Sequence, residues 1–338
     1  MKKLLILHIL SFIFFFSCSL GDNNDNPILG CTDAEALNYN LDAVEDDGSC
    51  EYLLFNGPDI IEVDFTKINR KVLIIGIDGF RSDAMTEQIT PFMHSLSQSR
   101  NGYYNLIHDA EAITYSGPNW TSMLTGVHQN KHGILNNSFE VNNYNIYPPF
   151  FHYIEEVQSS INTASIVNWT PINTHVSSGF ADSAPTESMS DLDVFQETQD
   201  LLVNSQADIL FLQFDELDGA GHSHGFSPGV IEYTNTANTL DSYVEILFNI
   251  IEAKRDAGED WIVFIISDHG GEEFSHADAE NPNIKQTIFF TEHPDLSFQA
   301  DCCYFSSQVD LAPTILDFMG ISSEEFDFNK DGNSVINP

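Results

Sequence analysis

An α/β domain, with a mostly parallel central sheet and helices on both faces, is the fold that this sequence predicts. Two observations predict it: short, continuously apolar runs recur along the chain, and segments with helical periodicity stand between them. Strands that are buried on both faces have this appearance, because neither face meets water. In such sheets ligands gather at the carboxyl ends of the strands, so the residues just after each run are the candidates for a site.

The predicted strands follow one another from residue 72 onward. They are the apolar runs at residues 72–77, 164–167, 209–214, 261–266 and 287–290. The longest helical pattern extends from about Val230 to Ala257. Hydrophobic residues make up 42% of the chain, which is enough to form the core of a large domain. A mainly disordered protein is therefore excluded.

The N-terminus has the features of an export signal. Lys2 and Lys3 precede an apolar run from Leu4 to Phe16, which is too short to span a membrane but has the length of a secretory signal. The run ends in FFSC, which resembles a bacterial lipoprotein signal with Cys18 as the lipidated residue. We therefore expect residues 1–18 to direct export, and a lipid anchor to hold the protein at the outer membrane, in the periplasm or on the cell surface. A secreted protein is the alternative.

The rest of the chain divides into three predicted parts. Residues 19–66 read as an acidic linker with a small module bounded by Cys31 and Cys50, which an exported protein can join as a disulfide. We interpret this module as a spacer rather than a calcium-binding unit. Residues 67–322 form the predicted catalytic domain, in which the adjacent Cys302 and Cys303 lack metal-site spacing. Residues 323–338 form a C-terminal tail, whose DFNKDGNS segment resembles a calcium loop without its closing Glu and is expected to be a turn.

The charge of the chain limits its partners. There are 51 acidic residues and 12 Lys and Arg, so the formal net charge is −39. So acidic a surface repels phosphate backbones, which excludes nucleic-acid binding as the primary role. An anionic substrate would need local positive charge, and a bound metal ion can supply it.

Carboxylates and imidazoles recur where three of the predicted strands end. These residues are Asp78, Asp218, His222, Asp268, His269 and His276. Asp and His side chains suit divalent zinc, and a set of this size suits two ions rather than one.

The order of motifs resembles the alkaline phosphatase superfamily from about residue 70 to 322, and most closely its type I phosphodiesterase/nucleotide pyrophosphatase branch. The motifs are IDGFR at 77–81, TYSGPNW at 114–120, LTGVHQNKHGI at 124–134, DGAGHSHG at 218–225 and SDHG at 267–270. Several motifs in the right order make a chance match improbable. The resemblance implies an alkaline phosphatase-like fold and a metal-dependent hydrolase of phosphoric esters.

The resemblance also implies two zinc sites and a covalent mechanism. One site would consist of Asp218, His222 and His276. The other would consist of Asp78, Asp268 and His269, with the nucleophile Ser116 as a further ligand. Asn137, which follows Ser116 by 21 residues, has the position of the family's asparagine that donates to a phosphoryl oxygen.

Neighbouring residues offer alternatives to these assignments. His224 is interpreted as a rim residue, because the family pattern is Asp-x-x-x-His. The nucleophile position departs from the nucleotide pyrophosphatase pattern, which has Thr before Phe-Pro-Asn, and Thr114 is the second candidate. Asn119 and Asn136 compete with Asn137, and both read better as loop and helix-start residues.

Together these features predict an exported, two-zinc phosphodiesterase or nucleotide pyrophosphatase-like enzyme that hydrolyses a small phosphate ester through phosphoserine. The sequence has no Lys or Arg between Lys131 and Lys254, which favours a singly charged diester over a dianionic monoester. Arg81 and Lys131 are interpreted either as structural residues or as substrate contacts. A sulfatase is disfavoured because Trp120 stands where its nucleophile motif needs Arg. Phosphomonoesterase, phosphonate hydrolase and phosphoryl transferase activities stay open, as does a non-catalytic surface binding protein.

Overall fold

The computed structural model describes residues 28–30, 32, 40, 43–49, 61–67, 69–97, 102–158, 160–299 and 306–337. The chain divides into two compact units, residues 1–57 and 58–338. In the first unit, β1 (Leu29–Gly30) pairs in parallel with β2 (Glu45–Asp46). The expected signal segment, the lipid anchor at Cys18 and both cysteine pairs lie outside the described residues, so they stay predictions.

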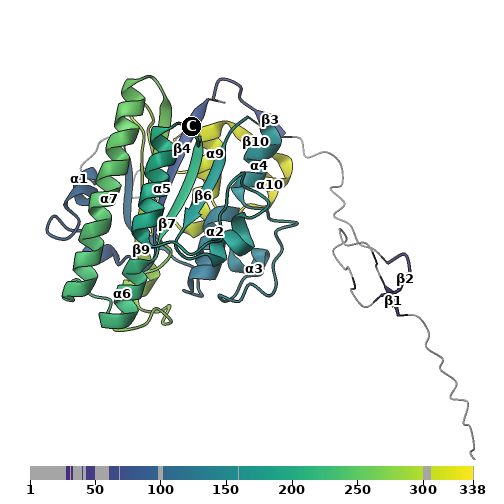
Figure 1. Ribbon diagram of the computed structural model, residues 1–338, viewed down its shortest axis with the longest axis horizontal. Helices are drawn as coiled ribbons and strands as arrows, with labels where there is room; N and C mark the ends of the chain where they lie inside the picture. The colour runs from purple at the N-terminus through teal and green to yellow at the C-terminus, as the bar shows by residue number, and fades with distance from the viewer. Residues whose placement is uncertain are drawn as a thin grey trace, which may run out of the picture. The chain divides into compact units, whose positions relative to one another are not determined.

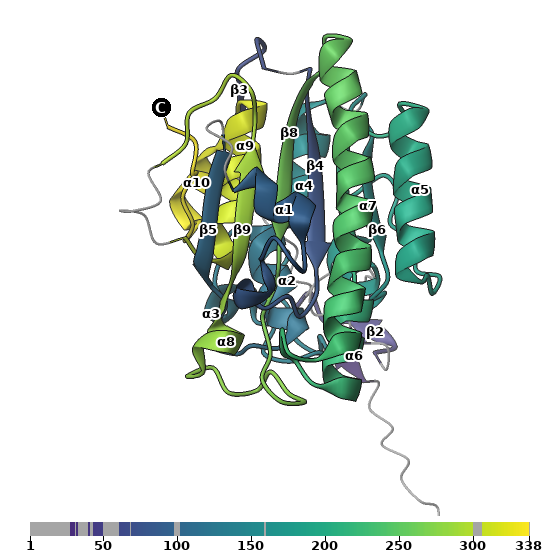
Figure 2. The ribbon, with the colours of Figure 1, turned by 90° about the vertical axis from the view of Figure 1, so that its left-hand side faces the viewer.

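A six-stranded sheet in the order β5-β9-β8-β4-β7-β6 forms the centre of the second unit (Figures 1 and 2). Its strands are β4 (Arg70–Ile77), β5 (Gly102–Asp109), β6 (Thr163–Val167), β7 (Ile209–Phe214), β8 (Asp260–Ile266) and β9 (Gln286–Glu292). The neighbours from β8 to β6 are parallel, whereas β9 runs antiparallel to both β8 and β5. The predicted α/β fold is confirmed, and its sheet is mixed.

All five apolar runs form strands of this sheet, because each is buried along nearly its whole length. The sixth strand, β5, has no such run, since its residues GYYNLIHD alternate between buried and more exposed positions. This alternation fits its place at the edge of the sheet.

Helices cover both faces of the sheet (Figure 2). Residues of α2 (Ser116–Thr125), α4 (Phe150–Val157) and α9 (Leu311–Met319) belong to the hydrophobic core on one face. Residues of α1 (Pro91–Leu96), α5 (Asp191–Val203) and α7 (Ile231–Asp256) belong to the core on the other. The longest predicted helix, 230–257, is thus α7.

Shorter elements complete the second unit. The helical ones are η1 (Ser82–Ala84), α3 (Gln129–His132), η2 (Asn173–Ser177), α6 (Glu216–His224), α8 (Pro282–Lys285), η3 (Gln308–Asp310) and α10 (Glu324–Asn329). A small antiparallel pair joins β3 (Ile61–Val63) to β10 (Ile321–Ser323). Among the described residues, no helix has both the length and the apolarity needed to cross a membrane.

The predicted C-terminal tail packs against the rest of the second unit. It contains α10, the Val335 side chain is fully buried, and the Asp331 N–H donates to the Gly126 carbonyl over 2.9 Å. The Lys131 ammonium lies 2.6 Å from an Asp331 carboxylate oxygen and donates to the Asn329 carbonyl. Within this calcium-like segment, the Lys131 ammonium thus contacts two oxygens, one of the Asp331 carboxylate and the carbonyl oxygen of Asn329.

Candidate active site

The candidate site lies at the edge of the sheet where β4, β7 and β8, which are parallel neighbours, all end. Asp78 directly follows β4, and Asp268 and His269 follow β8 after one residue. Helix α6 starts soon after β7 and carries Asp218 and His222. Topology therefore gathers side chains that are up to 191 positions apart in the sequence, 269 − 78.

Ser116 is the first residue of α2 and is 94% buried. Its hydroxyl oxygen lies 3.3 Å from His269 Nε2. The loop before it is fixed by Asn119, whose amide donates to the Tyr115 carbonyl over 2.8 Å and accepts from the Glu111 N–H over 2.7 Å. Asn119 therefore shapes the loop that presents Ser116.

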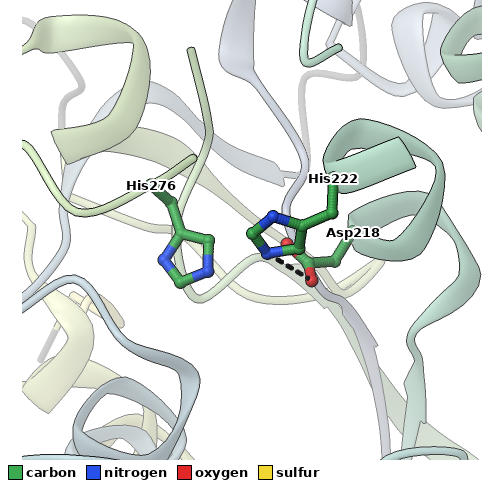
Figure 3. A group of neighbouring side chains, drawn as sticks. All are labelled: Asp218, His222 and His276. Atoms are coloured by element: carbon green, nitrogen blue, oxygen red, sulfur yellow. Dashed lines mark ion pairs between the residues drawn. The ribbon is translucent and has the colours of Figure 1, made fainter. Parts of the chain in front are cut away.

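Asp218, His222 and His276 come together as one group (Figure 3). One ligand atom from each lies within 4.8 Å of the others. Asp218 and His222 are one turn apart on α6, with Oδ2 and Nε2 at 3.3 Å. His222 Nδ1 lies 2.9 Å from the Phe274 carbonyl, and this contact orients Nε2 toward the group.

His276 belongs to the loop after β8 and is held in place by contacts with Thr114, which precedes α2. Its Nδ1 lies 2.8 Å from the Thr114 carbonyl, and the Thr114 hydroxyl donates to the His276 carbonyl. This pair of contacts gives Thr114 a positioning role for the loop of His276.

A second group surrounds His269 Nε2. Asp268 Oδ2 lies 3.2 Å away, Asp78 Oδ1 3.5 Å and Ser116 Oγ 3.3 Å. His269 Nδ1 is 2.8 Å from the Gly270 carbonyl, so the opposite ring nitrogen faces these oxygens. Asp218 also lies within 4.8 Å of ligand atoms of Asp78 and His269, and therefore stands between the two groups.

Gly79 allows the two groups to approach each other. Its φ is +69°, a conformation that favours glycine, and a Cβ atom there would lie 2.9 Å from the Cα, Cβ and Oδ1 atoms of Asp218. A side chain at residue 79 would therefore push α6 away from Asp78.

The residues present fit divalent metal ions. Three buried carboxylate oxygens, on Asp78, Asp218 and Asp268, have no hydrogen-bond partner among the described residues. Within the same part of the chain, no Lys or Arg forms an ion pair with them. Burying such charge without a partner is costly, and Asp oxygens with His nitrogens form a donor set that zinc accepts.

The pKa values of these groups show that burial disfavours their charged forms, which a bound cation would stabilise. Burial, together with the charges of Asp78 and Asp215, raises the pKa of Asp218 to about 9. Burial also raises the pKa of Asp78 and of Asp268 well above the usual range. Burial lowers the pKa of His276 to about 4, so its imidazole is neutral and can act as a ligand.

The two cations considered as substrate contacts are paired elsewhere. The Arg81 guanidinium forms ion pairs with Asp83 at 2.7 Å and Glu272 at 3.0 Å. Lys131 is paired with Asp331, as described above. Both therefore have structural partners within the fold.

Comparison with known proteins identifies the family. Residues 72–297, more than half of the chain, match the model of the type I phosphodiesterase/nucleotide pyrophosphatase family. The chain belongs to that family. The resemblance predicted from the sequence motifs is thereby confirmed.

One curated relative and two solved structures are similar to this type I phosphodiesterase family member. An uncharacterized pyrophosphatase/phosphodiesterase of Schizosaccharomyces pombe is 35% identical over 68 residues, which are 20% of this chain and only 14% of that protein. Murine ectonucleotide pyrophosphatase/phosphodiesterase 5, in an inactive form with AMP, superposes with a TM-score of 0.58 at 15% identity, covering 79% of this chain and 100% of that one.

The second solved structure is the C-terminal periplasmic domain of EptC from Escherichia coli, in complex with zinc. Its TM-score is 0.59 at 17% identity, and the match covers 83% of this chain and 89% of that one. These likenesses confirm the alkaline phosphatase-like fold. The family indicates an enzyme that acts on phosphoester bonds.

In this type I phosphodiesterase family member, Asn137 lies beside the start of α2. Its Oδ1 accepts the Gly117 N–H over 2.8 Å, next to Ser116. Asn136 instead accepts from the Ser138 N–H and hydroxyl in an exposed turn. Of the two adjacent asparagines, Asn137 is the one whose side chain is hydrogen-bonded to the segment that carries Ser116, and its role toward a phosphoryl oxygen stays a prediction.

Sequence reasoning missed two residues of the site. The side chains of Trp120 and Gln213 both donate to Asp78. A signal for Gln213 existed, since it is the single polar side chain in the apolar run ILFLQF. Trp120 gave no such signal, because a tryptophan in a helix reads as a core residue.

Proposed function

We propose that the protein is an exported, two-zinc phosphodiesterase that cleaves a small phosphate ester through a phosphoserine at Ser116. The observation that supports it most is the arrangement of the two ligand groups, with Asp218 between them and the Ser116 hydroxyl beside His269. Three carboxylate oxygens buried there lack hydrogen-bond partners among the described residues. Such an arrangement suits in-line displacement at phosphorus.

The ligand groups define the proposed roles. Asp78, Asp268 and His269 would hold an ion next to Ser116, and Asp218, His222 and His276 would hold the other. Bound zinc would lower the pKa of the attacking hydroxyl and offset the negative charge on the phosphate oxygens. The three imidazoles of His222, His269 and His276 each contact a backbone carbonyl through Nδ1, which keeps their orientation constant during the reaction.

The proposed reaction has two steps. After losing its proton to solvent, Ser116 Oγ attacks phosphorus and forms a Ser–O–P bond, while the ester bond to the first alcohol breaks and that alcohol takes up a proton. Water then attacks phosphorus, the Ser–O–P bond breaks, and Ser116 regains a proton as the phosphate product leaves. Asn137 would donate from Nδ2 to a non-bridging phosphate oxygen in both steps.

Replacing Asn137 tests this last role. We expect Asn137→Ala to lower kcat by roughly 10²- to 10³-fold, the cost of removing one such donor in other enzymes. Asn137→Asp keeps an acceptor for the Gly117 N–H but loses the donor, so it should be impaired similarly. Steady-state kinetics of both variants, with Asn136→Ala as the matched control, provide the measurement. Wild-type activity in Asn137→Asp would show that Asn137 serves only to hold Gly117.

Charge supports a diester as the substrate. Two zinc ions carry four positive charges, which Asp78, Asp218, Asp268 and an ionised Ser116 would balance. The half-buried Asp215 adds another carboxylate nearby, since its charge raises the pKa of both Asp78 and Asp218. Among the described residues, no Lys or Arg pairs with these carboxylates, so a dianionic monoester would lack a cation for its second charge, whereas a diester brings one charge only.

The substrate class can be tested on residues 19–338 loaded with zinc. We expect kcat/KM for an aryl phosphate diester to exceed that for the corresponding monoester, with protein stripped by a chelator as the blank. A preference for the monoester would keep the proposed metal site but refute the charge argument. No hydrolysis of either ester by zinc-loaded protein would contradict the proposed function.

Export and anchoring belong to the same proposal. The support is the signal-like segment before Cys18 and the location of a structural neighbour, the EptC domain, in the periplasm. We propose a lipid-anchored protein at the outer membrane that meets its small substrate outside the cytoplasm. Labelling with a radioactive fatty acid, lost in Cys18→Ala, would test the anchor.

A further inference from the structure

The Asp78 carboxylate is held through one of its oxygens. Oδ2 accepts two hydrogen bonds, from Trp120 Nε1 at 3.0 Å and from Gln213 Nε2 at 3.1 Å. Oδ1 has no hydrogen-bond partner in the part of the chain that the structure describes, and it faces His269 Nε2 at 3.5 Å. The two oxygens of the Asp78 carboxylate thus differ, because Oδ2 accepts two hydrogen bonds and Oδ1 accepts none from the described residues.

The orientation of the Gln213 amide follows from its third contact. Its Oε1 accepts the Trp169 backbone N–H over 2.9 Å, and a backbone N–H can only donate. The amide oxygen must therefore face Trp169, and the NH₂ group must face the carboxylates. That NH₂ group also lies 3.2 Å from Asp215 Oδ1, so both of its hydrogens have acceptors.

Trp120 connects the same carboxylate to the nucleophile helix. It follows Ser116 by four residues on α2, one turn along, and its side chain is fully buried. Its ring lies against Gly76 in β4, where an added Cβ would come within 2.6 Å of a ring carbon. A shift of α2 that moves Ser116 would therefore also move the indole N–H on Asp78.

We infer that Trp120 and Gln213 are positioning residues for Asp78: their hydrogen bonds occupy Oδ2, so that Asp78 offers a single oxygen to the metal ion. We call this pair of hydrogen-bond donors the clamp. This inference rests on the proposed zinc site and deepens it. With Oδ2 occupied by two neutral donors, Asp78 binds through Oδ1 alone. Because one of the donors belongs to α2, the clamp also sets the distance between Ser116 and that ion.

The clamp can be tested with two chemically identical substitutions. Trp120→Phe removes the indole N–H and keeps most of the buried ring. Trp261→Phe is the matched control, because Trp261 is 99% buried and its Nε1 also donates to a carboxylate, Glu259, over 2.9 Å. Trp261 lies near the start of β8, at the end of that strand away from Asp268.

We expect Trp120→Phe to bind one of the two zinc ions 10- to 100-fold more weakly in competition with a chelator, the usual cost of losing an outer partner of a metal ligand. The visible spectrum of the cobalt(II)-substituted protein should change, and kcat should fall while KM stays within about twofold. Trp261→Phe should leave all three readouts unchanged. Gln213→Met, which removes the amide donors at similar volume, should repeat the effect if Trp120→Phe does not fold.

The outcomes separate this inference from the proposed function. Wild-type zinc affinities and cobalt spectra in both Trp120→Phe and Gln213→Met would overturn the clamp and leave the two-zinc proposal standing. A wild-type protein that binds no zinc would overturn both. Zinc binding that weakens in the variants, in a protein that hydrolyses no phosphate ester, would support the clamp and contradict only the proposed activity.

Discussion

Replacing Ser116 with alanine is expected to lower kcat for a phosphate diester by about 10⁴-fold or more, as loss of a covalent nucleophile does in other hydrolases. The reason is chemical: the Ser–O–P bond cannot form, and Ser116 Oγ is the hydroxyl oxygen 3.3 Å from His269 Nε2. Stopped-flow or steady-state assays on the zinc-loaded variant provide the measurement. Full activity in Ser116→Ala would refute the covalent mechanism.

Two further variants make this result specific. Ser116→Thr retains a hydroxyl and should keep measurable activity, because the family pattern has threonine at this position. Thr114→Val removes the hydroxyl of the second candidate nucleophile, which donates to the His276 carbonyl. We expect Thr114→Val to weaken zinc binding while the bound enzyme still turns over. Loss of all activity in Thr114→Val with two zinc ions retained would favour Thr114 as the nucleophile.

Much of the fold was predictable because strands that are buried on both faces are continuously apolar in the sequence. The five strands that the sequence predicts are continuously apolar, and residues that follow three of them meet at one edge of the sheet. Parallel strands bring their ends together whatever lies between them in the sequence. This is why the sequence alone is enough to group Asp78, Asp218 and Asp268.

Other features depend on distances that no local pattern encodes. The direction of β9 follows from its pairing with both β8 and β5, and β5 itself has an edge strand's alternating residues. The position of Asp218 between the two ligand groups depends on how closely α6 approaches Gly79. The contacts of Trp120 and Gln213 with Asp78 likewise join three elements that are far apart in the sequence.

Replacing His222 with alanine is expected to leave the protein with about one tightly bound zinc ion instead of two. His222 is one of three residues in its ligand group, and Asp218 and His276 alone would make a poor site. Turnover should fall by more than about 100-fold, the upper range for losing even an outer partner of a metal ligand. Metal analysis of the purified variant, alongside kcat for the diester, provides the measurement.

His224→Ala is the matched control, because the same imidazole is lost two residues further along α6. Two residues correspond to about 200° around a helix, so His224 points away from Asp218 and His276. Its loss should change neither the zinc content nor kcat. If instead His224→Ala loses zinc and His222→Ala does not, the Asp-x-x-x-His assignment is wrong. The second ion would then lie on another side of α6, away from Asp218 and His276, and these two residues would not be its ligands.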